Sequence, residues 1–176
     1  RLELLLKATR KQSAGARILV VTESIFSMDG DAAPLREMSG LCDAHDALLL
    51  VDEAHAVGVL GPGGRGLVAE LGLEKRVHLQ MGTLGKALGV SGGYIAASRS
   101  VIDLLLNRAR SLVYSTAPPP AVAFTATKAI ELAQGPRGDE LRARLLDNVR
   151  GARAFSPRRS VSAGGPRARA PVAAIL

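Results

Sequence analysis

The chain has 176 residues, of which 47% are hydrophobic and 22% are charged, a balance typical of a globular protein rather than a disordered one. Its net charge is +7, and much of the excess arginine lies after residue 136 with almost no aromatic residues nearby, which favours a solvated segment over a nucleic-acid-binding surface. The single cysteine, Cys42, excludes an internal disulfide, and we predict no metal site. Neither a signal-peptide pattern nor a membrane-spanning apolar run is visible, so we expect a cytoplasmic protein.

Strands and helices are predicted to alternate along the chain. The end of a helix over residues 2–11 is followed by four predicted strands, at 16–22, 47–51, 77–81 and 92–98. Helices are predicted at 34–45, 67–73, 101–110, 118–134 and 139–155, with a flexible glycine-rich loop at 58–66 and a short extended piece at 112–114. This order predicts an α/β fold with a mostly parallel sheet, and the continuous apolar run at 16–22 predicts a strand covered on both faces.

The composition changes after the last predicted helix. Residues 156–171 are rich in serine, glycine, proline and arginine, which is typical of a linker or an exposed loop, and a new apolar run begins at Pro171. We therefore expect one domain over residues 1–150, then a linker and the start of an incomplete second domain over 151–176. A helix end at the first residue and an unfinished run at the last are the pattern of a piece of a longer chain.

Two short motifs match nucleotide-binding proteins but lack the context those proteins require. Residues 61–66 (GPGGRG) fit the dinucleotide-binding pattern G-x-G-x-x-G, yet no strand runs directly into them. Residues 52–55 (DEAH) spell the motif of a DEAH-type nucleic-acid-dependent ATPase, whose acids manage Mg²⁺ and the attacking water. No G-x-x-x-x-G-K-[ST] sequence precedes them, and Lys86 is followed by Ala87 rather than by serine or threonine. This ATPase and an inactive remnant of the fold stay open as alternatives.

The same acid and lysine also suit a pyridoxal phosphate (PLP) site. A lysine that loses its proton on burial can attack an aldehyde and form a Schiff base, and PLP carries such an aldehyde. PLP also needs a carboxylate beside its ring nitrogen, so that the ring stays protonated and accepts electrons. Asp52 follows an apolar strand, and Lys86 lies among small residues that allow close approach of the backbone. This pattern favours a cofactor site that contains Asp52, His55 and Lys86.

Longer sequence blocks occur in a specific order: residues 22–31 (TESIFSMDGD), 33–35 (APL), 51–58 (VDEAHAVG), 64–66 (GRG) and 82–89 (GTLGKALG). In these blocks the chain resembles the α-oxoamine synthases, a family of fold-type I PLP enzymes, over about residues 1–150. Residues 90–95 (VSGGYI) and 114–119 (YSTAPP) are most similar to the biotin-pathway branch, while the 2-amino-3-ketobutyrate CoA ligase and serine palmitoyltransferase branches stay open. The resemblance implies a three-layer α/β sandwich, the large domain of an aspartate-aminotransferase-like fold, here truncated.

The resemblance also implies roles for single residues. Lys86 holds the cofactor as a Schiff base and then moves protons, and Asp52 pairs with the pyridine nitrogen. His55 and Ser27 bond the phenolic oxygen of the cofactor, and Thr83 bonds its phosphate. The catalytic residues implied are therefore Lys86, His55 and Asp52.

The implied reaction is the decarboxylative condensation of an amino acid, L-alanine, with an acyl-CoA, pimeloyl-CoA or its carrier-protein equivalent, in biotin synthesis. Thr116 resembles a residue that reaches the phosphate of the neighbouring subunit's cofactor, which implies a homodimer, although its segment also suits a tight turn. We expect no nucleic-acid partner and no membrane span. The family's phosphate cradle and carboxylate-binding arginine lie outside the matched residues, and residues 151–170 depart from the family pattern, so we expect little activity from the 176 residues alone.

Overall fold

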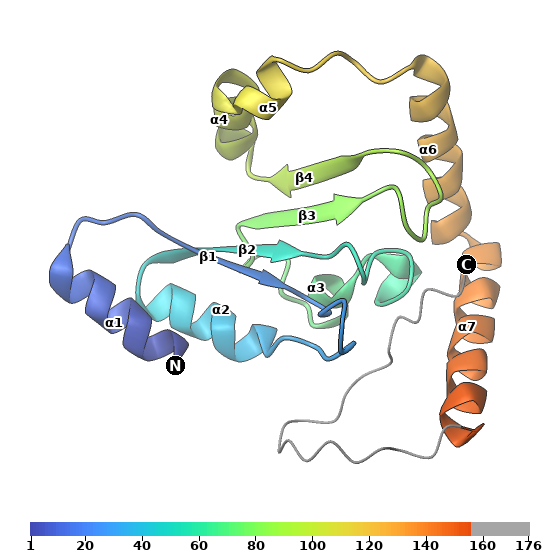
Figure 1. Ribbon diagram of the computed structural model, residues 1–176, viewed down its shortest axis with the longest axis horizontal. Helices are drawn as coiled ribbons and strands as arrows, with labels where there is room; N and C mark the ends of the chain where they lie inside the picture. Colours follow the sequence, from blue (N-terminus) through green and yellow to red (C-terminus); the bar gives the residue numbers. More distant parts are fainter. Residues whose placement is uncertain (156–176) are drawn as a thin grey trace.

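Four strands form one sheet in the order β1-β2-β3-β4 (Figure 1). They are β1 (Ile18–Glu23), β2 (Ala47–Asp52), β3 (Leu79–Thr83) and β4 (Gly93–Ala97), all within residues 1–155, the part of the chain that this computed structural model describes. β1, β2 and β3 run parallel, and β4 returns antiparallel to β3. The predicted α/β class with a mostly parallel sheet is confirmed, and each predicted strand is present with its ends shifted by at most two residues.

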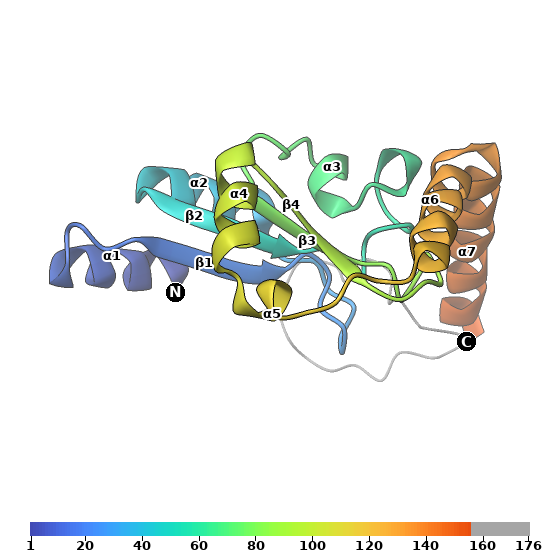
Figure 2. The same ribbon diagram turned by 90° about the horizontal axis from the view of Figure 1, so that it is seen from above.

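The parallel register brings the carboxyl ends of three strands to one edge of the sheet. Glu23 pairs with Asp52, and Asp52 pairs with Met81, two residues before the end of β3 at Thr83. Ligands of open α/β sheets bind at this edge. Two helices, α6 (Pro120–Gln134) and α7 (Pro136–Phe155), pack on each other, and Figures 1 and 2 place the pair beyond the carboxyl ends of the parallel strands.

The other helices are α1 (Leu2–Gln12), α2 (Leu35–Ala44), the one-turn helix α3 (Leu67–Glu70), α4 (Arg99–Arg108) and the one-turn helix α5 (Arg110–Val113). Of these, α2 packs on β2, and α4 packs on β4. Within residues 1–155, no helix is both long and apolar enough to cross a membrane.

One face of the sheet carries the core. Val20, Leu49 and Val51 are at most 9% exposed and belong to one cluster with Leu35 and Cys42 of α2. The cysteine is therefore a small core residue, as predicted. Full burial of an aliphatic side chain contributes roughly 1.5–3 kcal/mol, so this layer holds α2 against the sheet.

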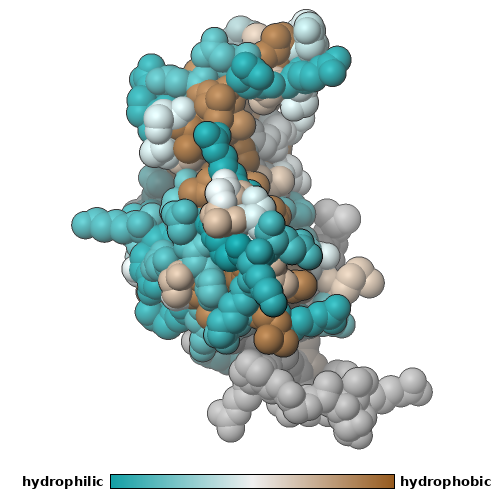
Figure 3. Space-filling model, turned by 90° about the vertical axis from the view of Figure 1, so that its left-hand side faces the viewer, coloured by the Kyte–Doolittle hydropathy of each residue, from teal (hydrophilic) through white to brown (hydrophobic). Residues whose placement is uncertain are grey.

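The opposite face of β1 and β2 is open in the described part of the chain. Leu19, Val21 and Leu48 are 50%, 63% and 42% exposed, and Leu19 lies opposite Leu48 in the register. Burial alternates with a period of two residues along both strands, so residues 1–155 cover them on one face rather than on both. Apolar side chains are also exposed on α4 and α5, and apolar surface gathers in the upper part of the face that Figure 3 shows.

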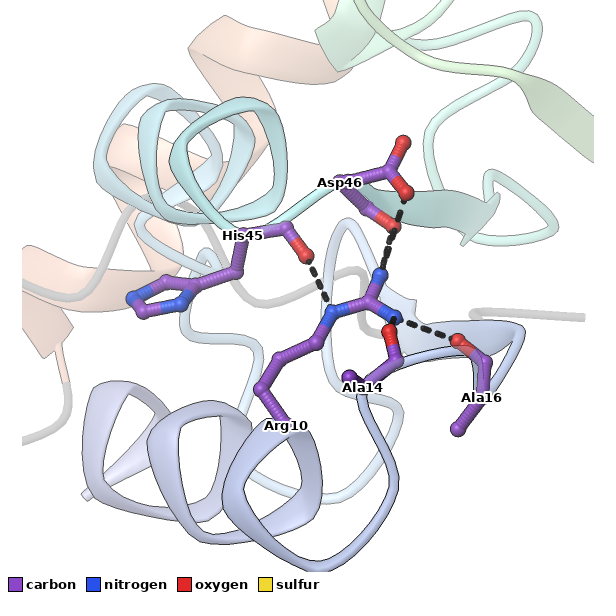
Figure 4. Close-up of polar contacts among 5 residues, drawn as sticks. All are labelled: Arg10, Ala14, Ala16, His45 and Asp46. Carbon is purple, nitrogen blue, oxygen red and sulfur yellow. Dashed lines mark hydrogen bonds and ion pairs between the residues drawn. The ribbon is translucent and has the colours of Figure 1, made fainter.

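Arg10 closes the fold at the opposite edge of the sheet, where β1 and β2 begin (Figure 4). Its Nε donates to the carbonyl oxygen of His45 at 3.0 Å, and its terminal nitrogens donate to the carbonyl oxygens of Ala14, Ala16 and Asp46. The guanidinium group also lies 3.3 Å from the Asp46 carboxylate. One planar side chain with several donors thus joins the end of α1, the start of β1 and the connection from α2 to β2.

Two short predicted elements, an extended piece and a helix, differ from the structure. Residues 112–114 are not extended: α5 and the turn after it include them, and the N–H of Val113 donates to the carbonyl oxygen of Ala109 at 2.9 Å. The helix predicted at 67–73 is shorter, because α3 ends at Glu70. Since α7 continues past residue 150 and the expected linker and apolar run at 156–176 lie outside the described residues, the domain boundary stays a prediction.

The glycine-rich loop at 58–66 has a defined structure and is not an open connection. The N–H of Gly58 donates to the carbonyl oxygen of Gly64 at 2.7 Å, and the N–H of Gly66 donates to that of Leu60 at 2.8 Å. A 3₁₀ turn, η1 (Pro62–Gly64), lies between these two bonds and packs against α6 and α7. The loop is therefore held closed by its own main-chain hydrogen bonds and is not the flexible connection that we predicted. It leads into α3, which lies next to the end of β2.

Candidate active site

Asp52 is the last residue of β2, and hydrogen bonds hold its main chain from both sides. The N–H of Ser24 donates to the Asp52 carbonyl oxygen at 2.8 Å, and the N–H of the next residue, Glu53, donates to the Met81 carbonyl oxygen at 2.8 Å. The Asp52 side chain is half-buried, and its Oδ1 accepts a hydrogen bond from the N–H of Ala54 at 2.8 Å. An aspartate that bonds the main chain two residues ahead favours a turn, which here follows the strand directly.

His55 lies in this turn and meets Lys86 across the carboxyl edge of the sheet. The N–H groups of Ala56 and Val57 donate to the Glu53 carbonyl oxygen at 2.8 and 2.9 Å, so the chain makes one helical turn. The Nε2 of His55 lies 2.9 Å from the Nζ of Lys86. A charged lysine only donates, so the imidazole then accepts through Nε2 and carries its proton on Nδ1. The structure thus brings together two residues that are 31 positions apart.

The loop from β3 to β4, residues 84–92, carries Lys86, and Thr83 closes it. The Oγ1 of Thr83 accepts from the N–H of Gly85 at 3.1 Å and donates to the carbonyl oxygen of Gly92 at 3.2 Å. Gly89 and Gly92 have φ angles of 64° and 123°, a conformation that favours glycine. The glycines around Lys86 therefore allow a short loop to reverse the direction of the chain.

Lys86 is exposed in the described part of the chain. The sequence analysis invoked burial to remove its proton, and residues 1–155 do not supply that burial, because the loop lies at the open edge of the sheet. Its amine faces an imidazole instead of an apolar wall. The geometry places a nucleophilic amine and a general acid or base next to each other with access from solvent.

Ser27 and Thr116 are not brought into contact with this cluster. Ser27 is exposed in the turn that follows β1, which puts it at the same sheet edge as Asp52. Thr116 is exposed in the connection from α5 to α6. Among the described residues, neither hydroxyl group makes a hydrogen bond, so the roles of both residues stay predictions.

Glu53, next to Asp52, is the buried neighbour of this site that the sequence analysis missed, because it considered Glu53 only as part of an ATPase motif. Its side chain is 1% exposed, and its Oε1 accepts a hydrogen bond from the N–H of Val68 in α3 at 3.2 Å. Burial raises the pKa of Glu53 from 4.5 to about 7. The bond from Val68 opposes this rise because it stabilises the charged form, and the nearby charge of Asp52 adds to it.

The second carboxyl oxygen of Glu53 shares a buried position with Ser24. Among the described residues, neither Glu53 Oε2 nor Ser24 Oγ has a hydrogen-bond partner. The Ser24 hydroxyl lies close enough to favour the charged form of Glu53, although the contact lacks the geometry of a hydrogen bond. A serine hydroxyl can accept from a protonated carboxyl group as readily as it donates to a charged one, so this pair accommodates either form.

Gly66 leaves the space that the Glu53 carboxyl group occupies. A Cβ at position 66 would overlap Oε2 of Glu53, and the φ of Gly66 is 100°, in the region that L side chains rarely adopt. Both conditions require glycine here. The block GRG at 64–66 was a signal that the sequence contained, but only the structure shows that its last glycine covers a buried acid.

Two cavities adjoin the cluster without containing it. One, of about 240 Å³, lies between the glycine-rich loop and α6. The other, of about 210 Å³, is lined by Glu53, Arg65 and Tyr94 among others, and Arg65 is paired with Glu74 at 3.7 Å. Neither cavity is lined by Asp52 or Lys86. The candidate site is thus the sheet edge itself, with Glu53 connecting it to the second cavity.

Comparison with known proteins identifies the family. The family model named aminotransferase class I and II matches residues 1–154. The chain belongs to the aminotransferase class I and II family. It is 61% identical over 116 residues to the 8-amino-7-oxononanoate synthase of Anaeromyxobacter dehalogenans (strain 2CP-C), which covers 66% of this chain and 29% of the relative. It is also 54% identical over 139 residues to the 8-amino-7-oxononanoate synthase of Pelobacter propionicus, and this alignment covers 79% of this chain and 36% of the relative. This member of the family spans about a third of the length of these relatives.

Solved structures of the family share the fold of the chain. A serine palmitoyltransferase from S. paucimobilis, determined with bound PLP in an aldimine with myriocin, has a TM-score of 0.80 at 34% identity and covers 90% of this chain and 42% of that one. An 8-amino-7-oxononanoate synthase from Francisella tularensis has a TM-score of 0.69 at 26% identity, and the match covers 85% of this chain and 43% of that one. The predicted aminotransferase-like large-domain fold and the resemblance to oxoamine synthases are confirmed.

Proposed function

We propose that the protein is a PLP-dependent acyltransferase of the α-oxoamine synthase type, which joins an amino acid to an acyl-CoA with loss of carbon dioxide. The observation that carries the proposal is the 2.9 Å contact between Lys86 and His55 at the sheet edge where Asp52 ends β2. Two further observations support the proposal: the chain belongs to the aminotransferase class I and II family, and a structurally similar protein was determined with bound PLP.

The donor set fits PLP. It offers a primary amine for the aldehyde (Lys86), a carboxylate for the ring nitrogen (Asp52) and an imidazole for the phenolic oxygen (His55). When bound, PLP supplies an electron-withdrawing ring that makes the α-proton of an amino acid removable. Thr83 fits less well, since its single O–H already donates to Gly92 and would have to turn away to reach a phosphate.

The residues of the chain then divide the work. The Asp52 carboxylate, fixed by the N–H of Ala54, would keep a proton on the ring nitrogen through its negative charge. The Lys86 amine would hold the cofactor through its aldehyde and would take and return the proton at the substrate α-carbon. His55 contacts the Lys86 amine and would offer a hydrogen bond to the phenolic oxygen of the cofactor.

The substrate pair that we propose is L-alanine with pimeloyl-CoA or its carrier-protein equivalent, in biotin synthesis. Structural likeness is higher for a serine palmitoyltransferase, with a TM-score of 0.80 against 0.69 for the 8-amino-7-oxononanoate synthase from Francisella tularensis, and identity to these two is 34% and 26%. Two other 8-amino-7-oxononanoate synthases are 61% and 54% identical, well above either value. Identity is the better guide here, because the scaffold is common to the whole family while side chains determine the substrate. A homodimer in which Thr116 reaches the neighbouring site is part of the proposal, and a cytoplasmic location stays a prediction.

The first experiment tests the cofactor. The purified protein is mixed with PLP, and we expect a visible absorption band that borohydride reduces and fixes to the chain. Lys86→Ala should lose the band, whereas Lys75→Ala, which removes an exposed lysine before β3, should keep it. Absence of a band in the unmodified protein would contradict the proposal and leave the ATPase and the inactive remnant as alternatives.

The second experiment tests the substrates. Because we expect little activity from residues 1–176 alone, the assay uses a protein that contains them and spans the full length of the relatives. Release of free CoA thiol is followed with L-alanine, L-serine or glycine as the amino acid and with acyl-CoA esters that do or do not end in a carboxylate. We expect turnover with L-alanine and the carboxylate-ended ester. A preference for L-serine with a long unsubstituted acyl chain would move the assignment to the serine palmitoyltransferase branch.

A further inference from the structure

Glu53 stands between two residues of the proposed site, yet its own side chain does not reach that site. It separates Asp52 from His55 in the sequence, and its carboxyl group is 1% exposed beneath Gly66. An acid in such a position is expensive to bury, because the charged form loses its hydration. Nothing in the chemistry of the proposed reaction uses Glu53, so its burial needs another explanation.

Four hydrogen bonds of Glu53 hold the turn, and two of them tie it to other elements. Its N–H donates to Met81 of β3, its carbonyl oxygen accepts from the N–H groups of Ala56 and Val57, and its Oε1 accepts from Val68 of α3. The three main-chain bonds fix the backbone on both sides of Glu53. The bond from Val68 links the turn to the glycine-rich loop, since Gly66 directly precedes α3. The side-chain bond is the one contact among them that a substitution can remove without changing the backbone.

The charged neighbours of Glu53 do not explain its burial as an ion pair. Asp52 is negative, Tyr94 is a phenol whose pKa is raised by burial and by the Glu53 charge, and Arg65 is paired with Glu74. Among the described residues, no cation lies within salt-bridge distance of Glu53. The carboxyl group instead accepts a hydrogen bond from the main chain of α3, and such a bond fixes the position of one segment relative to another.

We propose that Glu53 is a positioning residue for the PLP site: the hydrogen bond between its carboxyl group and the N–H of Val68 locks the turn that begins directly after Asp52 and carries His55. The proposal rests on the proposed PLP function of Asp52, His55 and Lys86. Glu53→Gln keeps an oxygen that accepts from Val68, and its amide can donate to Ser24, so the lock survives without the charge. Glu53→Ala removes the acceptor and leaves the N–H of Val68 buried without a partner.

The experiment compares the unmodified protein with Glu53→Ala, Glu53→Gln and Leu35→Ala, the last a matched control that destabilises the α2 core away from the turn. Without PLP, hydrogen exchange is measured at the amides of Ala56 and Val57. With PLP, the dissociation constant and the position of the visible band are measured. We expect Glu53→Ala to speed exchange at these amides, to weaken PLP binding about tenfold and to shift the band, while Glu53→Gln stays within about twofold of the unmodified protein.

Each outcome decides the question. A Glu53→Ala protein that loses stability as Leu35→Ala does, but keeps its PLP affinity and its band, would show a merely structural role and overturn the proposal. So would a Glu53→Gln protein as impaired as Glu53→Ala, since the charge rather than the hydrogen bond would then matter. If Glu53→Ala does not fold, Glu53→Asp, whose shorter side chain cannot reach Val68, takes its place. Failure of the proposed function is a separate result, because the unmodified protein would then show no band at all.

Discussion

The buried carboxyl group of Glu53 makes the stability of the protein depend on pH, and Glu53→Gln should remove that dependence. Burial raises the pKa of Glu53 from 4.5 in the unfolded chain to about 7 in the fold. The folded state therefore binds this proton more tightly than the unfolded state does. Its contribution to stability is fully present below pH 4.5 and is lost as the pH rises through about 7.

The magnitude follows from the size of the shift. One pKa unit corresponds to about 1.4 kcal/mol, so a shift from 4.5 to about 7 is worth roughly 3 kcal/mol in the free energy of unfolding. Solvent screening reduces this little, because the side chain is 1% exposed. Glutamine is neutral at every pH in this range and has almost the same shape. Relative to the unmodified protein, Glu53→Gln should therefore gain up to roughly 3 kcal/mol between acid and neutral pH.

Urea unfolding of both proteins at about pH 5 and about pH 8 measures this change. Glu37→Gln is the control, since it removes an exposed carboxyl group of α2 by the same change of side chain. A difference in unfolding free energy between Glu53→Gln and the unmodified protein that is the same at both pH values would refute the reasoning. It would mean that Glu53 does not hold a proton in the fold at neutral pH.

Two further predictions concern stability, one through a close contact and one through hydrogen bonds. Gly66→Ala should destabilise the protein by more than about 3 kcal/mol, because the new Cβ overlaps the Glu53 carboxyl group and the φ of 100° is strained for alanine. Gly72→Ala is the control: its φ is 65° and nothing lies within 4 Å, so it should show the strain alone, about 1 kcal/mol. Equal losses of stability in thermal melts of the two variants would argue against the contact with Glu53. Arg10→Met should lower stability by about 2 kcal/mol through four main-chain acceptors, while Lys11→Met, at the next position, should change it little.

The order of the fold could be predicted from the sequence because the elements are local patterns. Apolar runs with β-branched residues marked each strand to within two residues, and Pro34 marked the start of α2. The short segment at 112–114 was misassigned because three apolar residues fit a strand as well as a single helical turn. Which faces of the sheet are covered could not be predicted, because that depends on packing partners far away in the sequence. Leu19 and Leu48 show the result.

The site could be predicted where its residues follow strand ends and not where they depend on distant contacts. Asp52 and Lys86 stood out because charged side chains border apolar strands, and the 2.9 Å contact between Lys86 and His55 agrees with that grouping. The bond from Val68 to Glu53 joins positions 15 residues apart through a loop whose path only the structure shows. The sequence shows which residue types are present, but it does not show how the loop between Glu53 and Val68 folds back to bring them together.

The motif at residues 52–55 shows how burial separates two chemistries that share the same letters. In an ATPase, the glutamate of this motif must reach the attacking water, so its carboxylate has to face an open nucleotide site. Glu53 instead lies 1% exposed, bonded to the main chain of α3 and covered by Gly66. Moving it to solvent would break that bond and leave the N–H of Val68 unpartnered. Asp52 and His55, one on each side, are the members of the motif that remain partly exposed, and they are the two that the proposed PLP site uses.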